Sequence, residues 1–305
     1  MISLEREIAA APLSEEARAK LLALERRALV PVRPELRALL WLGVALLAGG
    51  VGVLIARNID RIGHVTLIAA IALAAAGCYA FAWRRRGAQS VVAEYVLLLG
   101  ALLLSADLAY AEAQLGILGE AWRWHGLVLA TVHTATAYLF RSRLVVSLAI
   151  VALAGFFGLD SEGEFLGRGA ADVALRAASA AAAFAVWRAV HGRVSSERAF
   201  DFPLAQAAFH LAMISTLAAI ADESMVLAGV IVLVALAALA AWYAVAARAE
   251  SFLIFAVLYL VVGIDMAILP RIDTWELGMG WIALTTPAAI AALFLVHRRW
   301  KERFA

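Results

Sequence analysis

Charged residues are scarce in this chain of 305 residues. Only 16% of the residues are charged and 65% are hydrophobic, whereas a soluble domain holds roughly a quarter charged residues and about half apolar ones. The charges stand in short blocks between long apolar runs. This segregation is typical of a polytopic membrane protein and argues against a soluble globular one.

Cysteine and recognisable catalytic motifs are equally scarce. The one cysteine, Cys78, cannot form an intramolecular disulfide, and the sequence has no CxxC motif for a metal or redox centre. HExxH, GxSxG, Walker A and GxGxxG motifs are also missing, and no large soluble segment could hold a nucleotide. We therefore predict no enzyme activity, no cofactor and no metal. Nucleic acid is not an expected partner, because the basic residues mark topology.

What the sequence does contain is a series of ten apolar runs, each a candidate membrane-spanning helix. The runs are Ala38–Ala56, Val65–Trp83, Val91–Tyr110, Trp124–Phe140, Leu144–Leu159, Val173–Val190, Pro203–Ala221, Met225–Ala247, Ser251–Leu269 and Gly280–Val296. A spanning helix needs about 20 residues, and the fifth run falls short of that length. In the first run, Ala48, Gly52 and Ala56 are spaced by four, which favours close helix packing. The sequence predicts an all-α bundle of about ten transmembrane helices over residues 38–296.

The first 37 residues form a separate charged arm. They hold seven basic and six acidic residues and lack the apolar centre of a signal peptide. Ser14, followed by Glu15 and Glu16, predicts a helix start, and Pro31 ends the helical pattern. We predict an amphipathic helix on the membrane surface, with a partner-binding helix as the alternative. Residues 297–305 form a basic tail.

The distribution of basic residues predicts the topology. With the N-terminus inside and ten spans, the inner segments hold 20 Lys and Arg residues and the outer segments hold six. Cytoplasmic loops carry such an excess, so we predict both termini inside, in the bacterial inner membrane. All nine tryptophans fall near a predicted helix end, which is where interfacial indoles belong.

Carboxylates within the apolar runs are the first functional candidates. Glu94 and Asp107 lie inside the third run, and carboxylates at membrane depth usually face protein or water. A helix turns about 100° per residue. Asp107, Tyr110 and Gln114 therefore share one face of the helix, and Glu94 and Ser105 share another. We expect this helix to contact protein on two sides.

The predicted outer half of the bundle holds the larger polar group. Its members are Arg57, Asn58, Asp107, Tyr110, Gln114 and Asp265. In a transporter, Asp107 and Asp265 would carry protons or cations, with Arg57 as the counter-charge. In a purely structural role, both acids would reach interfacial water or pair with Arg57. We predict that at least one of them faces a polar cavity between the first, third and ninth spans.

The predicted inner half holds Glu94, His133, Gln206 and His210. Gln206 and His210 share a helix face at i, i+4 spacing. A buried histidine can relay protons near neutral pH, or it can simply hydrogen-bond across helices. Two distant histidines are too few ligands for a metal site.

Two stretches carry a family resemblance. The first span ends ALLAGGVGVLIARNIDRIG, and the third and fourth runs read LLLGALLLSADLAYAEAQLGI followed by a run ending LFRSR. Over roughly residues 1–145 this resembles a bacterial family of integral membrane proteins known only as domain of unknown function 2157. That family has an Ala-Asn-Trp-Asp-like motif, matched here by Asn58 and Asp60 but not by Ile59, and a Gln-Tyr-like motif, matched by Gln114. The resemblance implies an architecture and no known activity.

Three functional classes follow from these patterns. A transporter of a small solute or proton predicts that the intramembrane polar residues line one cavity. A scaffold or sensor that binds a partner protein or lipid predicts that these polar residues are paired with one another and shielded from water. An enzyme predicts a constellation converging on one face. The layout and length are also similar to those of the ten-span drug/metabolite transporters, but the two halves of the chain do not match each other.

Overall fold

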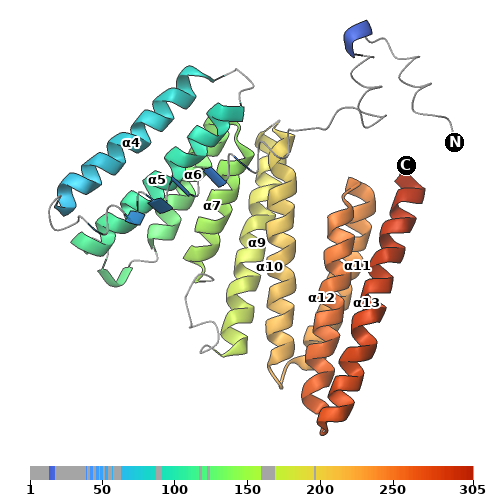
Figure 1. Cartoon of the computed structure of the whole chain (residues 1–305). Helices are drawn as coiled ribbons and strands as arrows, with labels where there is room; N and C mark the ends of the chain where they lie inside the picture. Colours follow the sequence, from blue (N-terminus) through green and yellow to red (C-terminus); the bar gives the residue numbers. More distant parts are fainter. Residues whose placement is uncertain are drawn as a thin grey trace. The chain divides into compact units, whose positions relative to one another are not determined.

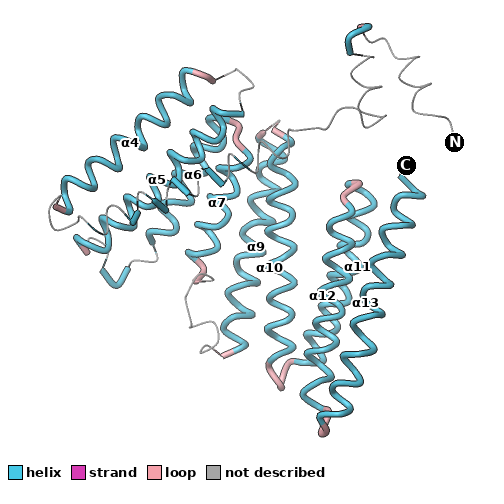
Figure 2. Tube along the Cα trace, viewed as in Figure 1, coloured by secondary structure: helices cyan, strands magenta, loops and turns pink. Residues whose placement is uncertain are grey.

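The computed structural model describes residues 14–17, scattered residues between 39 and 57, and residues 63–86, 91–116, 119–121, 124–158, 169–195 and 197–304. All regular secondary structure in these residues is helical (Figure 2). The described chain divides into two compact units, residues 1–104 and 105–305, and the division falls within one helix.

The first unit contains α4 (His64–Arg84) and the first half of α5 (Val91–Leu115). Leu97, Leu98 and Ala101 of α5 are buried. Gly100 faces α4 so closely that an added Cβ would lie 2.8 Å from the Cβ of Cys78. Cys78 is therefore a packing residue at a helix contact, as its apolar run predicts. In the charged arm, Ser14 accepts a hydrogen bond from the backbone N–H of Ala17, which confirms the predicted helix start.

The second unit contains the remaining helices (Figure 1). They are α6 (Trp124–Phe140), α7 (Arg143–Phe156), α9 (Ala170–Val194), α10 (Asp201–Ala221), α11 (Val226–Ala247), α12 (Glu250–Ile268) and α13 (Trp275–Phe304), with short 3-10 turns η1 (Gly119–Ala121), η2 (Arg198–Phe200) and η3 (Leu269–Arg271). Helix α10 contacts α7, α9, α11 and α12, so it is the central helix of this unit. A core cluster on α10, α11 and α12 includes Met213, Leu233 and Ala256.

The helix ends follow local sequence rules. Ser142 caps α7 by accepting a hydrogen bond from Val145 N–H, and Gly116 ends α5 in the left-handed conformation. Helices α6 and α11 instead end on arginines with positive φ, Arg141 and Arg248. In both cases the next residue donates a hydrogen bond five residues back, which is the Schellman pattern.

Several predicted bounds differ from the observed ones. The fifth run is a helix of 14 residues that ends at Phe156 instead of Leu159, because Phe157 and Gly158 form a turn there. At 1.5 Å per residue it is about 21 Å long, shorter than the ~30 Å hydrocarbon layer. Helices α9 and α13 are longer than predicted, and α13 continues through the basic tail to Phe304. Arg188 and Arg193 therefore both lie within α9.

Seven of the described helices are long and apolar enough to cross a membrane, and α7 is a shorter apolar helix. The count of ten spans and the orientation of the termini stay predictions, since most of residues 38–56 lie outside the described residues.

Charge is segregated between the two ends of the second unit. We call the end where α9, α11 and α13 finish and α10 and α12 begin the basic end. Its described residues include the basic Arg188, Arg193, Arg198, Arg248, Arg298, Arg299, Lys301 and Arg303, and the acidic Glu197, Asp201, Glu250 and Glu302. The opposite end holds the basic Arg176 and Arg271, and the acidic Asp172, Asp222, Glu223, Asp265, Asp273 and Glu276.

Candidate functional site

Asp107 is the buried carboxylate of the described chain. It lies in the second half of α5 with 7% of its surface exposed. Its Oδ1 atom has no hydrogen-bond partner among the described residues. Seven residues separate Asp107 from the closely packed Gly100, so both lie on the same face of α5. Burial without a partner is costly for a carboxylate, so Asp107 is the side chain for which a bound proton or cation would matter most.

His133 of α6 is bonded to α5 at a different position. Its Nε2 lies 2.8 Å from the Oγ of Ser105, and the imidazole is 1% exposed. Its other ring nitrogen has no hydrogen-bond partner in the part of the chain that the structure describes. Ser105 and Asp107 are two residues apart and thus about 200° apart around α5. The histidine and the carboxylate therefore occupy different faces of this helix.

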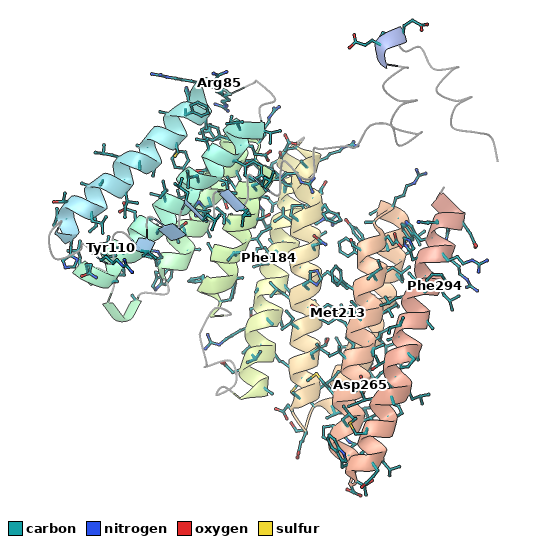
Figure 3. All side chains as sticks on the ribbon, viewed as in Figure 1. Arg85, Tyr110, Phe184, Met213, Asp265 and Phe294 are labelled. Atoms are coloured by element: carbon teal, nitrogen blue, oxygen red, sulfur yellow. The ribbon has the colours of Figure 1, made fainter. Side chains whose placement is uncertain are left out.

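Asp265 has a side-chain partner. The indole Nε1 of Trp281 on α13 donates a hydrogen bond of 2.8 Å to its Oδ1. Figure 3 shows Asp265 on α12, beside α13. This bond offsets part of the cost of a carboxylate in a membrane helix and joins α12 to α13.

His210 lies between three helices. A hydrogen bond of 3.2 Å joins its Nδ1 to the hydroxyl of Tyr259 on α12, and its ring meets that of Phe255 edge to face. On its other side, His210 lines an otherwise apolar pocket of about 290 Å³ with Val151, Gly155 and neighbouring residues of α7 and α10. The histidine therefore makes a cross-helix hydrogen bond, which is one of the two roles that the sequence left open for it.

The other predicted site residues are dispersed. Glu94 lies half-buried in the first turn of α5, and Tyr110 is half-buried in the same helix. Gln114 is exposed one residue before that helix ends, and Arg57 is exposed. Asn58 lies outside the described residues, as does most of the first predicted span. The predicted cavity between the first, third and ninth spans therefore stays a prediction.

A partly buried hydrogen-bond chain at the basic end was not predicted. His191 of α9 is 1% exposed and must donate through Nε2 to the backbone carbonyl of Glu197, at 2.8 Å, because a carbonyl only accepts. Its Nδ1 then accepts from the hydroxyl of Tyr138, at 2.8 Å, which itself accepts from Trp187 Nε1. The tautomer is inferred from this directional chain. Every polar side-chain atom of this hydrogen-bond chain has a partner, so the cluster has a structural role.

A second unpredicted cluster surrounds Arg188. The Nη2 of its guanidinium donates to the hydroxyl of Tyr243 at 3.2 Å, and its central carbon lies 5.3 Å from the centroid of that ring. Its Nε lies 3.9 Å from a carboxylate oxygen of Asp201. The sequence signal for Arg188 is a charge inside the apolar run Val173–Val190, where it counts as one of the basic residues that mark topology.

The exposed surface defines the class of protein. Large apolar side chains such as Leu73, Val151, Leu175 and Leu227 are about two-thirds or more exposed, and a soluble monomer rarely exposes apolar surface so extensively. Together with seven described helices of spanning length, this makes the chain a multi-pass, all-helical membrane protein.

Comparison with known proteins also indicates a membrane protein. Residues 8–146 match the family described as "Predicted membrane protein (DUF2157)", which confirms the resemblance inferred from the sequence. The match covers α4, α5, α6 and the start of α7, and it ends before α9. No curated protein and no solved structure matches the chain.

Proposed function

We propose that this protein transports a small solute or an ion across the bacterial inner membrane, with Asp107 as the group that binds the coupling proton or cation. The observation that carries the proposal is the burial of Asp107 in an apolar helix without a partner for Oδ1 among the described residues. An unpartnered aspartate at this depth in a membrane helix costs roughly 1–3 kcal/mol on insertion scales. A bound proton or cation offsets that cost and can be exchanged during a transport cycle.

Asp265 serves as the internal comparison for this proposal. It is also a carboxylate within a membrane helix, but it already accepts a hydrogen bond from Trp281. An asparagine at the same position keeps an oxygen that can accept that bond. Asp265→Asn should therefore preserve the local structure, whereas Asp107→Asn removes the charge that the proposal assigns to coupling.

The experiment uses the full-length protein in proteoliposomes with a pH-sensitive dye inside and an imposed membrane potential. Protons and Na⁺ are the probes, and thermal unfolding at increasing Na⁺ concentration measures binding. We expect wild type and Asp265→Asn to respond to the same cation, and Asp107→Asn to lose both the flux and the stabilisation. Retention of both responses in Asp107→Asn would contradict the assignment.

A second candidate function is a membrane scaffold or sensor without transport. It is supported by the cross-helix bonds of His133, His210 and Asp265, each of which joins two neighbouring helices. On this proposal the polar residues fix the helix arrangement, and a partner protein or a lipid binds at the surface. An inserted, folded wild-type protein that shows no cation response and no flux would favour the scaffold over the transporter.

A further inference from the structure

The second unit contains a pocket that Asp107 does not line. It has a volume of about 350 Å³ and lies between α9 and α10 on one side and α11 and α12 on the other. Ligand pockets commonly have volumes of about 300–1,000 Å³. The pocket is outside residues 8–146, so the family resemblance says nothing about it.

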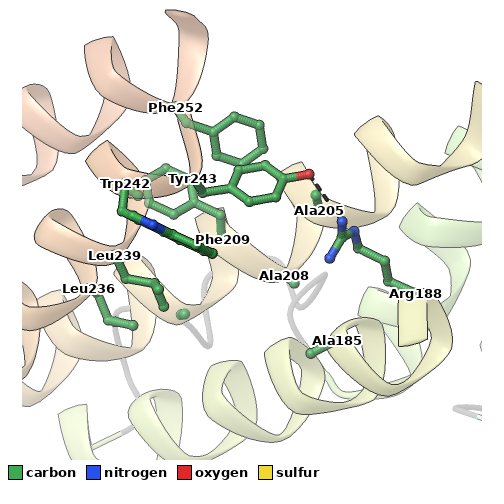
Figure 4. A pocket seen from close by; sticks show the side chains of 12 residues that line it. Ala185, Arg188, Ala205, Ala208, Phe209, Leu236, Leu239, Trp242, Tyr243 and Phe252 are labelled. Atoms are coloured by element: carbon green, nitrogen blue, oxygen red, sulfur yellow. Dashed lines mark hydrogen bonds between the residues drawn. The ribbon is translucent and has the colours of Figure 1, made fainter. Parts of the chain in front are cut away.

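Small side chains make the room in this pocket. Ala185 and Ala208 line it from α9 and α10, and Leu239 and Trp242 line it from α11 (Figure 4). Ala212 of α10 also lines it. Leu239 and Trp242 are 57% and 66% exposed, so the pocket opens on the apolar outer surface of the helices. An elongated apolar group in the membrane could enter from that side.

One cation lines this apolar pocket. Arg188 is held against Tyr243 by the hydrogen bond drawn in Figure 4, and its side chain remains 39% exposed. A guanidinium has five N–H donors in a planar fork that suits phosphate. Asp201 offsets part of its charge, but only from 3.9 Å. Donors of Arg188 therefore remain for an anion at the mouth of the pocket.

The surroundings favour an anionic ligand. Arg188 is six residues from the end of α9, or about 9 Å along the helix. The described residues of the basic end hold twice as many basic as acidic side chains, as counted above. Basic residues near a bilayer surface attract anionic lipids by about 1 kcal/mol each.

We propose that this pocket binds one anionic phospholipid, with an acyl chain in the alanine-lined groove and the phosphate on Arg188. The charge selects the headgroup, and the groove orders the chain. This site shares no residue with the proposed transport function, so either proposal can fail alone.

The test measures lipid retained by the full-length protein in native mass spectrometry, after addition of phosphatidylglycerol or phosphatidylcholine. Three variants are compared with wild type. Arg188→Gln removes the cation, and Ala208→Trp fills the groove while keeping the cation. Arg193→Gln is the matched control, because Arg193 is an exposed arginine of the same helix that does not line the pocket.

We expect wild type and Arg193→Gln to retain phosphatidylglycerol about fivefold better than phosphatidylcholine. Arg188→Gln should lose that preference, and Ala208→Trp should lose retention of both lipids. If Arg188→Gln does not fold, the test rests on Ala208→Trp alone. Unchanged lipid retention in Ala208→Trp would overturn the proposed pocket. Equal loss in both arginine variants would show attraction by general surface charge and overturn the proposal. Displacement of the lipid by inorganic phosphate would also overturn the proposal, because it would show that the groove contributes nothing to lipid binding.

Discussion

Single hydrogen bonds across helices recur throughout the second unit. Asp265 and Trp281, His210 and Tyr259, and the chain through His191 each place a polar side chain against a partner on another element. In a membrane, a buried polar group without a partner costs several kcal/mol, so such pairs fix which helix faces meet. The buried Oδ1 of Asp107 has no such partner among the described residues, and this motivates the transport proposal.

The chain through His191 predicts the effect of removing one hydroxyl. Tyr138→Phe leaves Nδ1 of the buried His191 and Nε1 of Trp187 without the partner that they share. We expect a loss of about 1–3 kcal/mol, measured by thermal or denaturant unfolding in detergent. Ser179→Ala is the control, since that exposed hydroxyl bonds only within α9. It should change stability by less than about 0.5 kcal/mol. Equal stability of the two variants would show that the hydrogen-bond chain through His191 does not stabilise the fold.

A second residue prediction concerns pH at the turn after α10. Hydrogen bonds from the hydroxyl and the backbone N–H of Ser224 lower the pKa of Asp222 below its ordinary value of 3.8. A carboxylate with a lowered pKa stabilises the fold at pH values above 3.8 and loses that effect as the pH falls through its own pKa. The difference in melting temperature between wild type and Asp222→Ala should therefore be constant near neutral pH and shrink in acid. A difference that grows in acid would contradict this.

At the scale of helices, close packing occurs at isolated glycines. The sequence favours close packing in the first span, around Gly52, but most of that span lies outside the described residues, so this stays a prediction. At Gly126 of α6, an added Cβ would lie 2.9 Å from the backbone oxygen of Ala152 on α7. The partner helix therefore decides where a glycine is needed for close packing.

This contact predicts unequal effects of the same substitution. Gly126→Ala must push α6 away from the α7 backbone, which should cost about 1–3 kcal/mol. Gly77→Ala in α4 meets no described atom within 4 Å, so the gain in helix propensity should make it neutral or stabilising by up to about 1 kcal/mol. Unfolding of both variants in the same detergent measures the difference. Equal effects would show that the contact between α6 and α7 is looser than described.

At the scale of the whole chain, the distribution of charge predicts the orientation in the membrane. Helices α9 to α13 of the second unit carry most of their basic residues at one end and most of their acidic residues at the other. This matches the segregation from which the sequence predicts both termini inside. The short α7 is the point at which that topology is most easily broken, since losing one crossing would reverse every loop after it.

Reporter fusions test the topology directly. Fusions after Arg37 and at Ala305 should both report the cytoplasm if ten helices cross the membrane. A fusion in the loop after α7 should report the opposite side. A periplasmic signal at either terminus would contradict the ten-span prediction, whereas a cytoplasmic signal after α7 would show that this helix does not cross.

The sequence by itself determined the class of protein and most of its helices. The bounds predicted for Trp124–Phe140 are those observed, because a spanning segment must satisfy its own backbone hydrogen bonds and therefore shows itself as a continuous apolar run. The sequence also singled out Asp107, His133 and His210 as candidates, since a polar residue in such a run is conspicuous.

Only the tertiary structure decided which polar residues are partners and where the pocket lies. Helices that are apolar all round carry no periodic signal for the face that meets a neighbour. Trp281 could therefore not be assigned to Asp265, nor Tyr243 to Arg188, before the helices were packed. Arg188 was missed as well, because near the end of its apolar run it is typical of the basic residues that mark topology. Helix α9 itself continues to Val194, past the end of that run at Val190. Where an apolar run stops is a property of composition, whereas where a helix stops depends on its caps and contacts.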